Sequence, residues 1–379
     1  MKLGLFLLSS LLVCPAQELR FVYPVPPPTG FSVRSDVAYK KVGTTSLAMD
    51  LFRPANGARG QRFPVLVFFN GFGGNWTRSS PQFRGWAKAA TAHGFAAVNE
   101  DSTPGHVEED FDTLALYLKE HAEDLQIDPE RIAVMAWSGN AAVGLALVES
   151  PLRQAIKVAV FYYGAAKVPQ IRLDLPVLFV RAGLDQPATN QSLDEAIAIG
   201  LTANAPWTAL NYPAGHHGFD LLDDNELSRD VIEQTFGFVK FALSASYQGV
   251  LRAGLPEASA AGALARGDYT KAISLYGAIA ETRPEDFRLL LAYGNALLGA
   301  KRYREARFQF DRVKKIGGAG PRDLGLPAAR ACALDNDQEA AMEWLKTIPA
   351  QFLPESIQVD PAFSGLKDRP DFQALFQQH

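Results

Sequence analysis

Short apolar runs alternate with helical patterns along the first two thirds of the chain. Residues 65–69 form a continuous apolar run, which is typical of a strand buried on both faces of a parallel sheet. Residues 111–125 instead place apolar side chains at helical spacing on one face. The pattern predicts strands at 33–42, 46–52, 65–69, 95–98, 131–136, 158–163, 177–181 and 208–212, and helices that include 83–92, 111–125 and 227–243. This alternation predicts an α/β domain with a doubly wound, mostly parallel sheet over residues 31–245.

After residue 245 the strand signals end and alanine becomes frequent. Tyr269 recurs as Tyr303, 34 positions later, and two further columns repeat at the same step: Ala272, Ala306 and Ala340, and Tyr276, Phe310 and Trp344. This period is typical of tetratricopeptide repeats, in which stacked helical pairs bury one another's apolar faces. We therefore expect a linker over 246–255 and an all-α, tetratricopeptide-like helical repeat domain over 256–379. Its last repeat is atypical, because Asp337 stands in the tyrosine column; an unrelated helical bundle is the alternative.

The first 16 residues have the order of a secretory signal peptide. Lys2 precedes an apolar run over residues 3–13, which is too short to span a bilayer, and small residues precede a cut after Ala16. The sequence therefore predicts export to a secreted or periplasmic location and no membrane span after processing. A buried N-terminal helix is the alternative, and lipidation of Cys14 is disfavoured because Val13 precedes it. Residues 17–30 are Pro-rich and predict an extended N-terminal arm.

Composition narrows the classes of partner. The 379 residues include 47% hydrophobic and 21% charged residues, as in an ordinary globular protein. A net charge of −4, with no basic cluster, gives no reason to expect a nucleic-acid partner. Removal of the signal leaves Cys332 as the single cysteine, so the fold depends on its core and not on an internal disulfide.

The chemistry centres on Ser138. This serine lies between the strand predicted at 131–136 and a helical pattern that starts at residue 141, the arrangement of a nucleophile elbow. The two flanking positions, usually glycine, hold Ala136 and Asn140. A serine at this place could also simply cap the helix.

Two partners follow Ser138 in the order serine, acid, histidine. Asp185 comes after the strand predicted at 177–181, and the adjacent His216 and His217 come after the strand predicted at 208–212. A serine hydroxyl is a poor nucleophile, so it needs an imidazole to take its proton and a carboxylate to orient that imidazole. The residues alone leave His216 as a rival base, and either partner could be an ordinary loop residue.

A Gly-rich loop over residues 70–74 follows the buried strand predicted at 65–69. Such a loop can direct backbone N–H groups at a developing oxyanion, and we expect the N–H groups of Phe72 and Gly139 to form this hole. Because no long insertion separates Ser138 from Asp185, an open pocket is expected. Its predicted neighbours are Gly71, Trp76, Trp137 and His216; the aromatic residues among them could equally belong to the core.

These motifs resemble the dienelactone hydrolase-like branch of the α/β-hydrolase superfamily over residues 37–245. The resemblance rests on residues 47–54, 70–74, 127–132 running into Ser138, 182–185 and 217–219. It implies that His217, which precedes Gly-Phe, is the base. Members named dienelactone hydrolase use a cysteine nucleophile, so Ser138 places the chain nearer the serine carboxylesterase relatives. The C-terminal part resembles tetratricopeptide proteins, including the segments 360–363 and 372–375.

The sequence thus predicts a serine hydrolase that cleaves a small or accessible ester, with Ser138, Asp185 and His217 as its catalytic triad and no metal or organic cofactor. Two alternatives remain. In one, the hydrolase fold is a scaffold and the repeats bind a protein or peptide partner. In the other, the same triad belongs to a serine peptidase.

Overall fold

The computed structural model describes residues 20–376 except 59, 151–152 and 169, so the signal peptide expected at 1–16 lies outside the described residues. Its larger part is an eight-stranded sheet in the order β1-β2-β4-β3-β5-β6-β7-β8. The strands are β1 (Phe31–Val42), β2 (Thr45–Pro54), β3 (Phe63–Phe68), β4 (Ala96–Glu100), β5 (Ile127–Trp137), β6 (Ile156–Tyr162), β7 (Val177–Ala182) and β8 (Trp207–Tyr212). The expectation of an α/β domain with a mostly parallel sheet is confirmed.

Strand direction follows the length of the connections. A two-residue turn joins β1 to β2, and this antiparallel hairpin meets β4, again antiparallel. From β4 to β8 all neighbours are parallel, because long crossovers separate the strands in the chain; most contain a helix, and the one between β6 and β7 is irregular over its described residues. The carboxyl ends of six parallel strands therefore meet along one edge.

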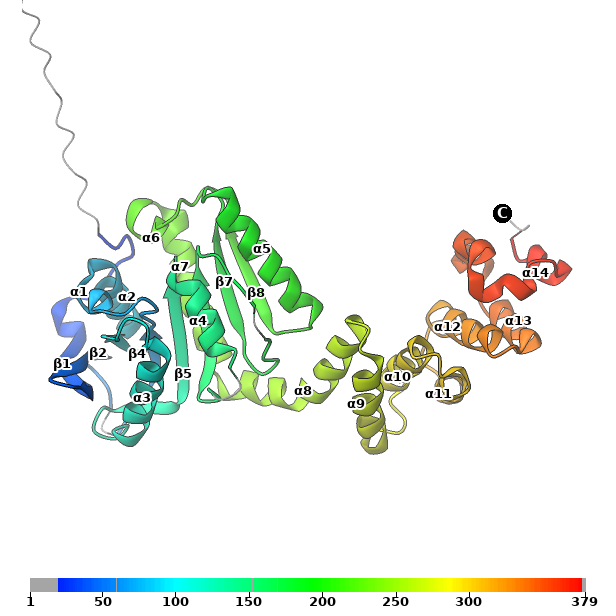
Figure 1. Ribbon diagram of the computed structural model, residues 1–379, viewed down its shortest axis with the longest axis horizontal. Helices are drawn as coiled ribbons and strands as arrows, with labels where there is room; N and C mark the ends of the chain where they lie inside the picture. The colour runs from blue at the N-terminus through cyan, green and yellow to red at the C-terminus, as the bar shows by residue number, and fades with distance from the viewer. Residues whose placement is uncertain (1–19, 59, 151–152, 169, 377–379) are drawn as a thin grey trace, which may run out of the picture.

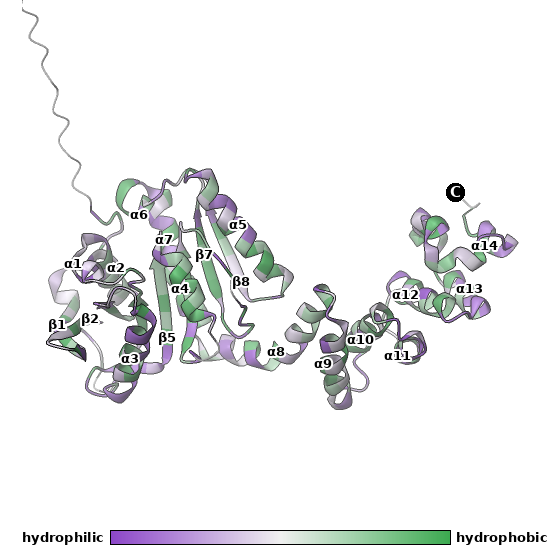
Figure 2. Ribbon diagram, viewed as in Figure 1, coloured by the Kyte–Doolittle hydropathy of each residue, from purple (hydrophilic) through white to green (hydrophobic). Residues whose placement is uncertain are grey.

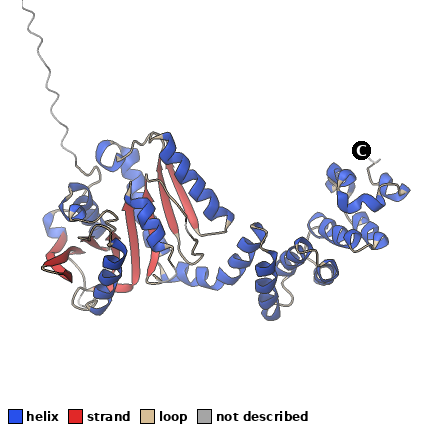
Figure 3. Cartoon of the chain, in the orientation of Figure 1, coloured by secondary structure: helices blue, strands red, loops and turns tan. Residues whose placement is uncertain are grey.

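Helices cover both faces of the sheet (Figures 1 and 3). One apolar core packs α3 (Val107–Glu120), α4 (Asn140–Val148) and α5 (Pro187–Thr202) on one face, and a second packs α2 (Pro81–Ala92) and α7 (Glu226–Ala242) on the other. The short helix α1 (Trp76–Ser79) lies in the connection that follows β3, and the short helix α6 (Phe219–Leu222) lies in the connection that follows β8. Figure 2 shows α4, which is buried between the sheet and its neighbours, largely in the hydrophobic colour.

The N-terminal arm is packed on the domain. Phe21 contacts the Trp86 ring at 5.2 Å between centroids, and Tyr23 contacts Phe236 at 6.0 Å. The Val22 N–H donates to the Asp220 carbonyl at 2.9 Å. This part of the arm therefore lies beside the loop that carries His217.

The second part of the chain is entirely helical over its described residues. Helices pair as α8 (Ala245–Ala265) with α9 (Tyr269–Thr282), α10 (Phe287–Gly299) with α11 (Tyr303–Ile316), and α12 (Pro321–Leu334) with α13 (Gln338–Lys346). The 3₁₀ turns η2 (Ala350–Phe352), η3 (Glu355–Val359) and η4 (Pro361–Leu366), and helix α14 (Pro370–Ala374), close the domain. None of the described helices has both the length and the apolar character needed to cross a bilayer.

The repeated columns fall on the second helix of each pair. Ala272 and Ala306 are fully buried, and the aromatic column formed by Tyr276, Phe310 and Trp344 is at most 9% exposed. Asp337, which replaces the column tyrosine, is the N-cap of α13 and accepts from Ala340 N–H at 3.1 Å. Cys332, which is buried, belongs to the same core, and burial raises the pKa of its thiol to about 11.

Helix α8 connects the two parts. The predicted linker, residues 246–255, lies inside this helix. Asn204 Nδ2, just after α5, donates to Ala258 O at 3.3 Å, and a side chain at Gly262 would collide with the Ala203 carbonyl oxygen. Helix α8 therefore rests on the edge of the sheet where the parallel strands begin, and Figure 1 shows the other repeat helices extending away from that edge.

Candidate active site

The serine, acid and histidine meet at the carboxyl edge of the sheet. Ser138 follows β5, Asp185 follows β7, and His217 follows β8. Ser138 Oγ lies 2.7 Å from His217 Nε2, and His217 Nδ1 lies 2.7 Å from Asp185 Oδ2. The Asp185 side chain is 2% exposed and that of His217 is 45% exposed, so the imidazole is open to solvent on one side and held by a buried carboxylate on the other.

The turn at Ser138 is strained. Its φ is 54°, in the left-handed region that a non-glycine residue rarely occupies. The Ser138 N–H bonds to Tyr162 O at 2.9 Å, and Ala141 N–H bonds to Ser138 O at 3.0 Å, so the strand ends and the helix begins within three residues. A Cβ at Gly164 would overlap the Ser138 carbonyl oxygen; only glycine lets the end of β6 pass this closely.

Asn140 does not carry the unusual backbone. It is the first residue of α4, is 2% exposed, and follows Gly139, whose φ of −59° is also helical. The unusual backbone conformation is therefore concentrated at Ser138 itself. Asn140 Oδ1 approaches Gly71, where an added Cβ would lie 3.0 Å away.

The predicted oxyanion residues are adjacent. A Cβ on Gly139 would lie 2.6 Å from the Phe72 ring, so the ring rests on Gly139 beside Ser138. Phe72 is 60% exposed. The segments that carry Phe72 and Gly139, whose backbone N–H groups are predicted to form the oxyanion hole, are therefore in contact.

The loop that carries Phe72 is fixed at both ends by strand β4 and the residues after it. Asn70 Nδ2 donates to Gly74 O at 2.9 Å, and Ser102 Oγ donates to Asn70 O at 2.9 Å. Gly74 and Ser102 also form an isolated antiparallel bridge. Asn70 therefore closes the loop on itself.

Two of the predicted pocket residues have other roles. Trp137 is 1% exposed, and its ring packs edge-on against Phe68 and Phe83 in the core, so the prediction that it lines the pocket is wrong. Its side chain points to the α2–α7 face because side chains alternate along β5. Trp76 is half-buried and donates from Nε1 to Asn70 Oδ1, which supports the loop.

His216 is separated from the serine. Its Nδ1 lies 3.0 Å from Asp223 Oδ1, and its side chain is 60% exposed. The geometry therefore selects His217 as the imidazole that faces Ser138. Gly71 is half-buried beside Asn140, at the base of the loop.

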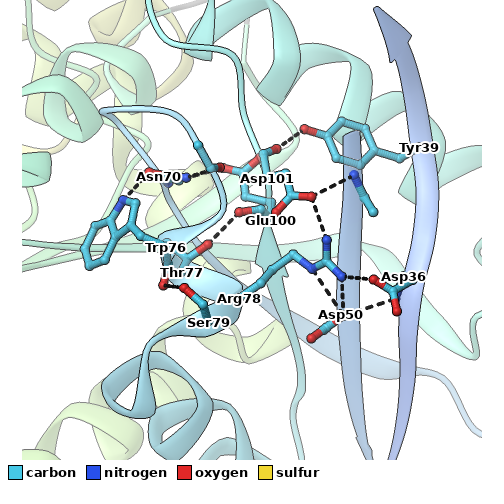
Figure 4. Close-up of polar contacts among 12 residues, drawn as sticks. Asp36, Tyr39, Asp50, Asn70, Trp76, Thr77, Arg78, Ser79, Glu100 and Asp101 are labelled. Carbon is cyan, nitrogen blue, oxygen red and sulfur yellow. Dashed lines mark hydrogen bonds and ion pairs between the residues drawn. The ribbon is translucent and has the colours of Figure 1, made fainter. Parts of the chain in front are cut away.

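A network that the sequence did not reveal lies behind the loop (Figure 4). The Asn70 N–H donates to Glu100 Oε1 at 3.3 Å, and Thr77 Oγ1 donates to Glu100 O at 2.5 Å. Next to them, Arg78 binds three carboxylates: Asp101 at 2.6 Å, Asp50 at 3.1 Å, and Asp36. The clue in the sequence was the Glu100–Asp101 pair at the end of an apolar strand.

Glu100 is fully buried. Burial raises the pKa of its carboxyl to about 8, aided by the Asp110 and Asp101 charges and opposed by the hydrogen bond from Asn70. Glu149, after α4, is the matched case: burial raises its pKa to about 7, against the hydrogen bond from Arg172 N–H.

These shifts predict a pH dependence of stability. The folded chain holds a proton on Glu100 that the unfolded chain releases above its ordinary pKa of 4.5, so folding stability falls as pH rises from about 4.5 to about 8. The slope is at most about 1.4 kcal/mol per pH unit. Gln cannot release this proton, so the free energy of unfolding of Glu100→Gln minus that of wild type should rise over this range and then level off. For Glu149→Gln the rise should end near pH 7.

Urea unfolding at pH 5 to 9, monitored by tryptophan fluorescence, measures the free energy of unfolding of both variants and of the wild type. Trp76, Trp86, Trp137 and Trp207 report on the sheet domain. A difference between Glu100→Gln and wild type that is the same at every pH would show that Glu100 does not titrate in this range.

Comparison with known proteins gives one family match, in the helical part of the chain. Residues 263–322 match the family model of the tetratricopeptide repeat. The matched residues run from the end of α8 to the start of α12. No curated protein sequence matches the chain.

Solved structures resemble the sheet domain. An α/β-hydrolase from a Medee basin deep-sea metagenome library is 15% identical, covers 57% of this chain and 99% of its own, and has a TM-score of 0.47. A bacterial heroin esterase is 17% identical over 57% of this chain and 86% of its own, with a TM-score of 0.46. Esterase 2 of Thermogutta terrifontis, phosphorylated by paraoxon, is 18% identical over 58% and 97%, with a TM-score of 0.45.

Among the described residues, no group of three or more His, Cys, Asp or Glu side chains is arranged to hold a metal ion.

Proposed function

We propose that this protein is a serine hydrolase that cleaves carboxylic esters through an acyl-enzyme, and that it belongs with the serine carboxylesterase relatives of the dienelactone hydrolase-like branch. One observation carries the proposal: Ser138 Oγ, the His217 ring and the Asp185 carboxylate form a continuous chain of two 2.7 Å contacts, with the serine on a strained turn. Such a chain is the arrangement that activates a serine hydroxyl.

In the proposed reaction, His217 Nε2 takes the proton of Ser138 as Oγ attacks the ester carbonyl carbon. The N–H groups of Gly139 and Phe72 stabilise the oxyanion, and His217 then protonates the leaving alcohol. Water attacks the resulting acyl-enzyme with His217 again as base, which releases the acid and restores Ser138. Asp185 holds the imidazole in one orientation and stabilises its charged form.

The loops around Ser138 favour an uncharged ester. Three of them expose a large apolar side chain, namely Phe72, Leu184 and Leu222, at 60%, 55% and 48%. Neither lysine nor arginine occurs in the segments 70–76, 138–140, 163–166, 183–187 and 214–222. A carboxylate on the substrate would therefore find no cation on these segments, whereas an apolar acyl group would contact the exposed side chains.

A fluorophosphonate probe tests the proposal on the mature chain. We expect one probe per molecule, located by mass spectrometry on the peptide that contains Ser138. We also expect faster hydrolysis of p-nitrophenyl butyrate than of p-nitrophenyl hemisuccinate. A folded protein that takes up no probe would contradict the serine-hydrolase proposal, and equal labelling of several serines would show that Ser138 is not specially activated.

The repeat domain has a separate proposed role. Helix α8 leaves the sheet at the edge opposite the one where α6 and the His217 loop lie (Figure 1). We propose that the repeats bind a protein or peptide partner without contributing to the ester site.

We also propose that the chain is exported through its N-terminal segment.

A further inference from the structure

A buried polar cluster lies behind His217. Asp220, three residues further along the same loop, is fully buried. Its Oδ1 accepts from the Tyr163 hydroxyl at 2.6 Å. Its Oδ2 accepts from Trp86 Nε1 at 2.7 Å and from Gln82 Nε2 at 2.8 Å.

This carboxylate has neutral partners. Burial raises the pKa of Asp220, whereas the bonds from Gln82, Tyr163 and Trp86 lower it. Within the part of the chain that the structure describes, no lysine or arginine forms an ion pair with it. Burying a carboxylate without a cation is costly even when it accepts three hydrogen bonds. An apolar residue at position 220 would avoid the cost of burying a carboxylate. We therefore look for a role of Asp220 other than stabilising the fold.

Tyr163 connects this cluster to both the histidine and the serine. Its ring lies against the His217 imidazole, with 4.8 Å between centroids and 59° between planes. Its backbone is strained, with φ at 32°, and the next residue is Gly164, which passes directly beneath the Ser138 carbonyl. The ring is thus a wall for the imidazole, and Asp220 fixes its hydroxyl end.

His217 needs such a wall. Its side chain is 45% exposed, and the bond to Asp185 alone fixes one ring atom and leaves the ring free to tilt about it. Asp220 is bound to the chain in a second way, because its carbonyl accepts from the Val22 N–H of the N-terminal arm. The cluster therefore joins α2, the end of β6 and the arm to the loop that carries the base.

We propose that Asp220 is a positioning residue: by holding Tyr163 it keeps the His217 ring aligned with Ser138 Oγ and Asp185. This inference rests on the proposed function. A misaligned His217 ring accepts the Ser138 proton less readily, and substrate binding does not correct this. The loss should therefore appear in kcat and in the rate of probe labelling, with little change in KM.

The test uses Asp220→Asn, in which an amide nitrogen replaces one acceptor oxygen and faces either the Tyr163 hydroxyl or the two N–H donors of Trp86 and Gln82. We expect kcat and the fluorophosphonate labelling rate to fall together by about 10- to 100-fold, the range of outer partners that orient an active group, with KM within about 2-fold. Tyr163→Phe keeps the ring and removes the hydroxyl, and we expect a smaller fall in kcat. Asp223→Asn is the matched control, because Asp223 lies in the same loop but binds His216; its kcat should be unchanged.

The double variant distinguishes positioning from stability. If Asp220 acts through Tyr163, adding Asp220→Asn to Tyr163→Phe should cost less activity than Asp220→Asn alone. Additive losses, or a lowered melting temperature with unchanged kcat, would overturn the proposal. If Asp220→Asn does not fold, Tyr163→Phe decides, and an unchanged kcat overturns it. Wild-type protein that takes up no probe would instead refute the proposed function itself.

Discussion

Replacing His217 by alanine is expected to lower kcat for ester hydrolysis by about 10⁴-fold or more, the size of loss that follows removal of the base from such a chain of residues. The neighbouring change, His216→Ala, should leave kcat within about 3-fold of wild type, since surface substitutions away from a site have small effects. The reason is geometric: His217 Nε2 lies 2.7 Å from Ser138 Oγ, whereas His216 is bound to Asp223.

The pair of variants needs only a steady-state assay with a p-nitrophenyl ester and a circular-dichroism spectrum to verify folding. The two substitutions are chemically identical and adjacent, so nonspecific effects on the loop should affect both. Equal losses would show that the loop, and not the imidazole of His217, is what the reaction needs. A larger loss in His216→Ala would reverse the assignment of the base.

The second large effect concerns Ser138. Both Ser138→Ala and Ser138→Gly should abolish probe labelling and lower kcat by about 10⁴-fold or more, because the attacking oxygen is lost. The two variants should differ in stability. At φ 54° an alanine keeps the strain of a left-handed residue, while glycine relieves it, so we expect Ser138→Gly to be the more stable by about 1 kcal/mol.

Urea unfolding of the two inactive variants under one set of conditions measures that difference. The comparison separates the chemical role of the hydroxyl from the cost of holding it on a tight turn. Equal stability of the two variants would mean that the turn is not strained. Retained labelling in either variant would place the nucleophile at another residue.

The sequence predicted the elements of the fold well, because their signals are local. Alternating patterns marked the first two strands, apolar runs marked most of the others, and the 34-residue spacing marked the repeats. Boundaries were less accurate. The strand predicted at 131–136 begins earlier, at Ile127, since the first residues of β5 pair with Phe63 and Pro64 of β3. Pairing partners distant in the chain decided that boundary.

The site was predictable to the same extent. Ser138, Asp185 and His217 follow strand ends, so their order in the chain and the topology of a parallel sheet suffice to bring them together. Trp137 was misplaced because β5 is buried on both faces, and its composition does not show which face a given side chain takes. Glu100 and Asp220 were missed because their burial comes from segments far away in sequence; the acidic pair at the end of an apolar strand was the one local clue to Glu100, and Asp220 had none.

The placement of the repeats has a consequence for how the protein would meet its substrate. Helix α8 attaches where the parallel strands begin, and the proposed ester site lies where they end. A molecule held by the helical hairpins and an ester at Ser138 would therefore lie at opposite ends of the sheet domain. Neither excludes the other. A partner bound by the repeats would leave the Ser138 edge of the sheet open. Any ester carried by the same assembly would then be present near Ser138 at a raised local concentration, without tight binding at the catalytic site itself.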